Sequence, residues 1–283
     1  MAAFFRGTPV VVKPSNRHAS VGVVRVDRAE DVAWAWHECS TADEVRTVTG
    51  RPRELNYIAE EFVGGYQVSA ETLVRDGEVV FDTVDLMSTA TGPYFPILAV
   101  TVPAPIPSEE YAAVIRSARL LVAALGVADG TVHSEWKVLD GVPHLIECAA
   151  RVPGAFTPEL AERSYDGFSM YGDQIRLLAG LDPELPGPPT STASVRWFHP
   201  PAGKLREVRG AARLAEDPAV FLHRIKVAPD DVIPVCRDGW QRIGYFAVHA
   251  PGAAEVAGKV AELLAEVRFE VDPAEPAGAE EPR

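Results

Sequence analysis

Two Asp-Gly dipeptides, Asp76-Gly77 and Asp140-Gly141, constrain the fold of this chain more than any other feature. Each stands between two runs rich in apolar residues; the pairs of runs are 66–74 with 79–84 and 131–139 with 142–148. Asp-Gly between such runs is a strong hairpin signal, because both residues tolerate the positive φ of a tight two-residue turn. The sequence therefore predicts two antiparallel β-hairpins.

Helical and extended segments share the rest of the chain. Apolar residues recur at helical spacing in four segments: 30–38, 108–125, 158–180 and 253–267. Further extended runs are predicted at 9–13, 21–26, 56–62, 193–198, 220–227 and 244–248. The proline-rich stretch 181–191 is the best candidate for a domain boundary. The pattern is that of an α+β protein.

Composition excludes several classes of function. Lys and Arg number 27 against 40 Asp and Glu, and the resulting net charge of -13 disfavours binding to nucleic acid or an anionic membrane. No apolar window is long enough to span a bilayer, and the N-terminus lacks the features of a signal peptide, so we expect a cytoplasmic protein. The 3 cysteines lack the spacing of a zinc site or a disulfide framework. The polar, proline-rich tail 272–283 is predicted to be disordered.

Two glutamates flank the second predicted turn. Glu135 and Glu147 lie on neighbouring strands, and Arg151 follows. Paired carboxylates suit a hard cation such as Mg²⁺, and an arginine suits phosphate or carboxylate oxygens, although solvated strand carboxylates are the commoner explanation of such a pair. A regular hairpin would pair Glu147 with Ser134, on the opposite face from Glu135. A shared cation therefore predicts a bulge or a widened loop in this hairpin.

Two other segments are candidates for nucleotide binding. Lys13 ends an apolar strand before a loop with Ser15 and Ser20, which could fold over phosphates or could be an ordinary hairpin loop. The residues Glu60, Glu61, Phe62 and Val63 precede two glycines; they could hold an adenine, or the glycines could simply make a turn.

The order and spacing of these segments resemble the ATP-grasp superfamily, and most closely its carboxylate-amine ligase and L-amino-acid ligase branch. The similar segments are PVVVKP (9–14), EEFVGGYQVSAE (60–71) and HSEWKVLDGVPHLIECAARVPG (133–154). The stretch 193–271 is similar to the closing domain of such ligases.

The resemblance implies two α+β subdomains that grip ATP. Residues 1–65 would form part of the first, 66–186 the second with its metal site, and 192–271 a small closing domain. These ligases usually have a preceding domain with an earlier phosphate-binding lysine, which we do not find here. We expect that a partner supplies it, that the chain is a fragment, or that its start was wrongly chosen; a homodimer is a further possibility.

The resemblance also implies roles for individual residues. Lys13 would contact the phosphates and assist catalysis together with Arg151. Glu135 and Glu147 would hold Mg²⁺, with Mn²⁺ as an alternative. The nucleotide would be bound by Ser15, Ser20, Glu60, Glu61, Phe62, Val63 and Gln67.

The implied activity is ATP-dependent formation of an amide from a small carboxylate and an amine, through an acyl phosphate. Ala149 replaces a usual asparagine ligand, and Gln67 replaces a ribose-binding glutamate. Substrate contacts are expected in 87–101, which has no basic residue and could be a simple apolar cover. Arg17, His18, Arg151 or a partner would then meet the substrate carboxylate. The alternatives are a non-catalytic or partner-dependent nucleotide-binding subunit, and a structural domain without nucleotide.

Overall fold

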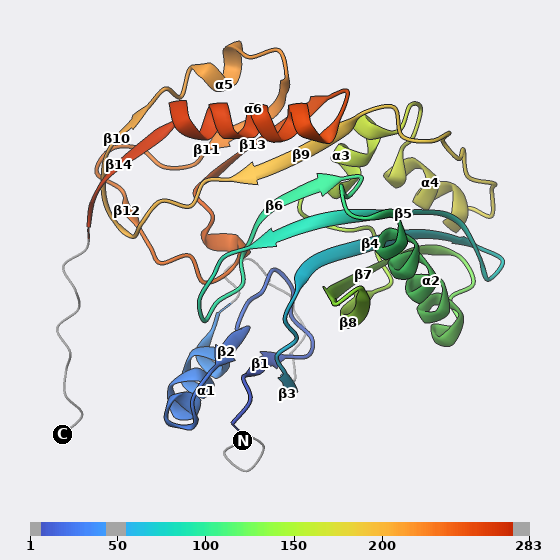
Figure 1. Ribbon diagram of the computed structural model, residues 1–283, viewed down its shortest axis with the longest axis horizontal. Coiled ribbons are helices and arrows are strands. Elements are labelled where there is room, and N and C mark those ends of the chain that lie inside the picture. Colours follow the sequence, from blue (N-terminus) through green and yellow to red (C-terminus); the bar gives the residue numbers. More distant parts are fainter. Residues whose placement is uncertain (1–6, 44–54, 274–283) are drawn as a thin grey trace.

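The computed structural model describes residues 7–43 and 55–273. Its strands form three sheets in this part of the chain, and helices pack against them (Figure 1). The predicted α+β class is confirmed. Among the described residues, no helix is both long and apolar enough to cross a membrane.

The largest sheet has eight strands in the order β11-β13-β9-β6-β5-β4-β7-β8. Their bounds are β4 Tyr66–Arg75, β5 Glu78–Thr89, β6 Ile97–Val102, β7 Gly130–Leu139, β8 Val142–Ala149, β9 Thr192–Trp197, β11 Val220–Ile225 and β13 Gly244–Ala250. Every neighbouring pair is antiparallel. The two predicted hairpins, β4–β5 and β7–β8, are confirmed.

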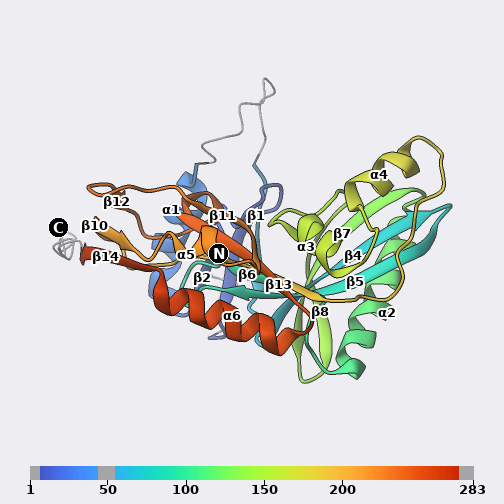
Figure 2. The same ribbon diagram turned by 90° about the horizontal axis from the view of Figure 1, so that it is seen from above.

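Four helices cover the large sheet. On one face, α3 (Thr157–Ser164) and α4 (Met170–Leu178) pack on apolar residues of β4, β6 and β9. On the other face, α2 (Ser108–Leu125) packs on β4, β5 and β7, and α6 (Ala253–Glu266) packs on β13. These last two helices lie over different ends of the sheet (Figure 2). The first face keeps a layer of buried polar side chains among its apolar ones.

A separate N-terminal sheet, drawn in blue in Figure 1, lies below the large sheet. It has the order β2-β1-β3. Its elements are β1 Val10–Pro14, β2 Val24–Val26 and β3 Tyr57–Glu61, with the 3₁₀ turn η1 Ala29–Asp31 and the helix α1 Val32–Thr41. Valines of β1 and β2 form a small core with Ala35 and Cys39 of α1. The apolar runs at both ends of the loop 15–20 are therefore strands, as predicted.

The C-terminal part contributes to two sheets. A small sheet has the order β12-β10-β14. The elements beyond α4 that have not yet been named are β10 Gly203–Arg209, α5 Arg213–Glu216, β12 Val232–Ile233, η2 Gly239–Gln241 and β14 Arg268–Pro273. Strands β9, β13 and β11 instead extend the large sheet, because β9 pairs with β6. The boundaries predicted for the domains stay a prediction.

Segment 87–101 was expected to be a substrate-contact region or an apolar cover; it contains the end of β5 and most of β6, which is a central strand of the large sheet. The predicted disordered tail 272–283 lies outside the described residues, apart from Asp272 and Pro273, which end β14.

Candidate functional site

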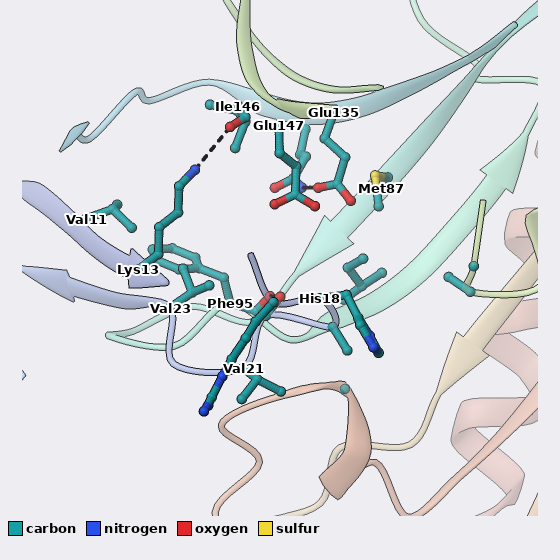
Figure 3. A pocket seen from close by; sticks show the side chains of 18 of the residues that line it. Val11, Lys13, His18, Val21, Val23, Met87, Phe95, Glu135, Ile146 and Glu147 are labelled. Atoms are coloured by element: carbon teal, nitrogen blue, oxygen red, sulfur yellow. Dashed lines mark hydrogen bonds between the residues drawn. The ribbon is translucent and has the colours of Figure 1, made fainter. Parts of the chain in front are cut away.

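The β7–β8 hairpin contains the predicted bulge. From the turn up to Trp136, which faces Leu145, the pairing is regular; the next pair is Glu135 with Glu147. Ile146 is therefore the extra residue. Because one inserted residue reverses the faces of the residues beyond it, both glutamates now lie on the same face of the sheet. Figure 3 shows their carboxylates side by side, pointing into a cavity.

The bulge also supplies a hydrogen-bond acceptor for Lys13. The Nζ atom of Lys13 donates to the carbonyl oxygen of Ile146 at 3.0 Å and lies 2.6 Å from Oε2 of Glu60 (Figure 3 shows the first contact). Lys13 is 7% exposed at the end of β1. The lysine thus connects the N-terminal sheet to the acidic hairpin of the large sheet.

One cavity of about 600 Å³ collects most of the predicted site residues. Those on its walls are Lys13, Ser20, Glu60, Glu61, Phe62, Val63, Gln67, Glu135, Glu147 and Arg151. Ser15 does not line it, since its hydroxyl donates to the carbonyl oxygen of Asn56 at 3.2 Å, on the outside of the loop. The structure therefore brings the ammonium, the guanidinium and both carboxylates to a single hollow.

The two facing carboxylates fit a divalent cation. Burial raises the pKa of Glu147, and the charge of Glu135 raises it further, against the opposing effects of Lys13, His133 and Arg151. A cation between the two would remove this repulsion, and oxygen donors are the ligands that Mg²⁺ prefers. Within residues 7–43 and 55–273, no group of three or more His, Cys, Asp or Glu side chains could hold a metal ion. Phosphate oxygens and water would complete the coordination, as is usual for Mg²⁺.

Glu135 is held by two further side chains. Gln67 donates from Nε2 to Oε2 of Glu135 at 2.6 Å, so its amide is engaged with the carboxylate. His133 lies with Nε2 3.3 Å from Oε1 of Glu135 and with Nδ1 2.8 Å from Oε1 of Glu71. Burial alone would lower the pKa of His133, but the charge of Glu71 and the bonds to both carboxylates raise it well above its usual value. A protonated His133 can donate to both.

The sequence analysis gave no role to His133. A signal was available, because His133 stands two residues before Glu135 and must share its face of the strand. Ala149 pairs with His133 in the ladder and offers no side-chain oxygen to the site.

The opposite wall is largely apolar. The guanidinium of Arg25 lies 4.0 Å from the centroid of the Phe62 ring, and the ring of Phe95 stacks with that ring at 6.1 Å. Ser20 donates to the carbonyl oxygen of Phe95 at 2.9 Å, which holds the loop against this wall. Flat apolar surfaces of this kind suit an aromatic heterocycle such as adenine.

Gly65 fixes the segment Glu60–Val63 against the large sheet. Its φ is +79°, and a Cβ atom there would lie 2.0 Å from the carbonyl oxygen of Val138 in β7. No other residue fits, because any side chain would overlap the backbone of β7.

A C-terminal segment that the sequence analysis did not single out closes one side of the cavity. The backbone N–H of Gly239 in η2 donates to the carbonyl oxygen of Ala19 at 2.8 Å, and the rings of Trp240 and His18 meet edge to face at 5.6 Å. Arg242, which follows η2, also lines the cavity. Its position could not be found from spacing alone, since it depends on how β9 and β13 join the large sheet.

Solved structures share this fold. An L-amino acid ligase from Bacillus licheniformis superposes with a TM-score of 0.77 at 24% identity, over 93% of this chain and 64% of that one. A phosphoribosylglycinamide synthetase from Anaerococcus prevotii superposes with a TM-score of 0.65 at 18% identity, over 93% and 64% of the two chains. This chain thus spans less than two thirds of the length of either structure.

The chain also has relatives in sequence. An uncharacterized protein, y4rH, of Sinorhizobium fredii is 26% identical over 270 residues, which are 94% of this chain and 54% of that protein. Carnosine synthase 1 of Gallus gallus is 25% identical over 185 residues, which are 64% of this chain and 20% of that protein. The chain therefore spans about half the length of the first and a fifth of the second.

Two family models match the chain. The L-amino acid ligase C-terminal domain 2 matches residues 196–272. The ATP-grasp domain matches residues 6–159, which is more than half of the chain and includes every residue of the acidic hairpin. By this match and by the fold, the chain belongs to the ATP-grasp family.

Proposed function

We propose that this chain is an ATP-dependent carboxylate-amine ligase, which forms an amide and releases ADP and phosphate. The observation that supports the proposal is the meeting of Lys13, Arg151 and the two bulge-aligned glutamates in one cavity. Phosphoryl transfer needs cations around the transferred group and a site that holds the reactants in line. The cationic side chains of Lys13 and Arg151 in one cavity with both carboxylates support the proposal.

The reaction would run in two steps. A carboxylate oxygen of the acid attacks the γ-phosphorus of ATP, the bond to the β-phosphate oxygen breaks, and an acyl phosphate and ADP form. The amine nitrogen then attacks the acyl carbon, phosphate leaves, and the nitrogen loses a proton. Both steps move negative charge between oxygens, which favours fixed cationic groups in a site that excludes water.

The chain's residues divide these tasks. Lys13 and Arg151 offset charge on the transferred phosphoryl group, and Glu60, Glu61, Phe62 and Val63 hold the adenine. Ser20 and its loop cover the phosphates and exclude water. Mg²⁺ bound by Glu135 and Glu147 would neutralise charge on the phosphate oxygens; Mn²⁺ would be accepted by the same oxygen donors.

Several wider assignments belong to the same proposal. The subdomains 1–65 and 66–186 would grip the nucleotide between them, and 192–271 would close the cavity. The substrates would be small amino-acid-like molecules, in the cytoplasm. Association with a partner protein, or as a homodimer, belongs to the same proposal.

Two measurements test the proposal. Thermal unfolding with and without Mg-ATP reports binding, and a ligand at a hundredfold excess over its Kd stabilises the folded state by about 2.7 kcal/mol. ADP release is then measured over a panel of amino acids offered as acid and as amine. We expect both a shift and acid-dependent ADP release. The absence of a shift would contradict nucleotide binding, and a shift without ADP release would support the non-catalytic alternative.

A further inference from the structure

The proposed ligase needs a cation for the carboxylate of a substrate, and segment 87–101 has none. We propose that Arg242 binds a substrate carboxylate in the cavity, an inference that rests on the proposed function. Arg242 is contributed by the C-terminal segment after η2 and lines the cavity that also holds Lys13 and the acidic pair.

The contacts of Arg242 fix its orientation without neutralising its charge. Its Nε donates to the carbonyl oxygen of Gly239 at 2.8 Å, its Nη1 donates to the carbonyl oxygen of Ile97 at 3.1 Å, and its guanidinium lies 4.1 Å from the ring centroid of Trp197. All three partners are uncharged. A guanidinium has five N–H donors in a rigid fork, so several remain for a ligand.

No carboxylate of residues 7–43 and 55–273 forms an ion pair with Arg242. Asp238 lies close enough to affect its pKa, but Oδ1 of Asp238 accepts from the backbone N–H groups of Trp240 and Gln241 at 2.7 and 3.3 Å. Lys13, by contrast, has Glu60 as a direct partner. Arg242 is thus a cation of the cavity wall whose direct partners are neutral.

The surroundings of Arg242 make its charge costly in the absence of an anion. Burial lowers the pKa of Arg242 to about 10, against the opposing effects of Cys236 and Asp238. An unpaired buried charge is destabilising, and a bound carboxylate would offset that cost. The stacked, planar guanidinium suits bidentate contact with a carboxylate, which is also planar.

Arg242 lies beside the turn that follows Arg151. Phe156 in that turn stacks on Trp197 at 6.2 Å, and Trp197 in turn carries the guanidinium of Arg242 on its ring. Ala155 of the same turn and Thr157, the first residue of α3, line the cavity. A substrate held by Arg242 would therefore lie in the same cavity as Arg151, the group proposed to assist phosphoryl transfer. The carboxylate could belong to the acid or to an amino acid that supplies the amine.

The test compares Arg242→Gln with Arg242→Lys in ADP-release kinetics. The glutamine amide can still donate to a neighbouring carbonyl but has no charge, and the lysine keeps the charge without the fork. We expect Arg242→Gln to raise the KM of one carboxylate-bearing substrate about ten- to a hundredfold, the loss typical of a hydrogen bond to a charged group, with Arg242→Lys intermediate. The KM of ATP and the Mg-ATP thermal shift should stay within about twofold of wild type.

Kinetics with different amine substrates distinguish the two sources of the carboxylate. If the amino acid that supplies the amine is bound, its KM rises in Arg242→Gln, whereas the KM of its carboxamide does not change between variants. If the acid is bound, the KM of the acid rises with either form of the amine. Arg237→Gln is the matched control, because Arg237 is in the same segment and pairs with Glu38 at 2.8 Å outside the cavity; its kinetics should match wild type.

Equal changes in the KM of ATP and of both substrates would overturn the proposal, because they indicate a structural role, and so would unchanged KM values. Failure of the proposed function is recognised separately, as no ADP release by the wild-type chain. In that case calorimetric titration with the amino-acid panel in the presence of Mg-ATP decides. Binding that wild type shows and Arg242→Gln loses supports the proposal, and equal binding or none by wild type overturns it.

Discussion

The two hairpins of the large sheet are built in the same way but end in different chemistry. Their turns are alike, with φ of 51° and 83° at Asp76-Gly77 and 50° and 77° at Asp140-Gly141. Each second strand contains one extra residue, Val80 in β5 and Ile146 in β8. In each case the shifted register brings an acid to the cavity-side face of the sheet: Asp85 opposite Ser69, and Glu147 opposite Glu135.

The surroundings of the two carboxyl groups, Asp85 and Glu147, differ. Asp85 is 0% exposed, and neither of its carboxyl oxygens accepts a hydrogen bond from any described residue. Burial and the charge of Glu71 raise its pKa well above the usual range. Glu147 instead faces the cavity, where Lys13 and Arg151 favour its charged form. A bulge can place an acid, but access and nearby cations decide whether that acid can act as a ligand.

The largest expected difference between the hairpins is in activity. Glu147→Gln removes one of the two charges proposed to hold the metal, and we expect ADP release to fall at least about a hundredfold. Asp85→Asn should leave ADP release close to wild type. Thermal stability without nucleotide should not fall in Glu147→Gln, because repulsion from Glu135 is removed. Glu109 is exposed, so Glu109→Gln is the control and should keep wild-type turnover. If Glu147→Gln also keeps its turnover, Glu147 does not have the proposed metal-binding role.

The link from the bulge to the N-terminal sheet can be tested at Lys13. Lys13→Met removes the donor to the Ile146 carbonyl and the charge proposed to meet the phosphates. We expect Mg-ATP affinity to fall about ten- to a hundredfold by calorimetry. Lys204→Met is the matched control, since Lys204 also has a carboxylate partner, Asp230 at 2.6 Å, but lies in the small C-terminal sheet. If the two variants bind Mg-ATP with equal affinity, Lys13 does not contribute to nucleotide binding.

The buried acid predicts an effect of pH on stability. Because the pKa of Asp85 is raised in the folded state, that state holds the proton longer, and the free energy of unfolding falls as pH rises above the unfolded-state value of about 4. Asp85→Asn removes this loss. We expect it to be more stable than wild type by about 1–3 kcal/mol at pH 8, with a difference that shrinks towards pH 4. Urea denaturation at several pH values measures this; parallel curves of the free energy of unfolding against pH for the two proteins would contradict a raised pKa of Asp85 in the folded state.

The smallest effect concerns the turns themselves. Gly77→Ala and Gly141→Ala should each cost about 1 kcal/mol, because both glycines have left-handed backbone. A Cβ would meet nothing within 4 Å at Gly77 and only Oε1 of Glu110, at 3.8 Å, at Gly141. Equal costs in urea denaturation would show that the turns are energetically equivalent. Unequal costs would mean that the two turns themselves differ in energy, apart from any difference caused by the bulges.

The sequence analysis succeeded where local signals were strong. The Asp-Gly turns and apolar runs predicted both hairpins, and the regular pairing that they imply showed that Glu135 and Glu147 could meet only across an extra residue. The position of that residue could not be derived, because a bulge at any residue between the turn and the glutamates would have the same result.

Long-range pairing was beyond the reach of the sequence. Strand β6 is an apolar run, and its partner β9 lies far along the chain, beyond three helices and the β7–β8 hairpin. The same pairing brings Arg242 to the cavity, so its place could not be predicted either. Ser15 was expected beside the phosphates. The chain turns after Pro14, and the hydroxyl of Ser15 donates to the carbonyl oxygen of Asn56 instead.

The tight contact between Gly65 and the carbonyl of Val138 has a consequence for motion. Gly65 lies two residues after the segment proposed to hold the base, and Val138 is in the strand of Glu135, so we expect these two parts of the proposed site to move together. Any opening that admits ATP then has to come from the side of Lys13, Ser20 and η2. Hydrogen exchange with and without nucleotide should therefore change there more than along β4 and β7.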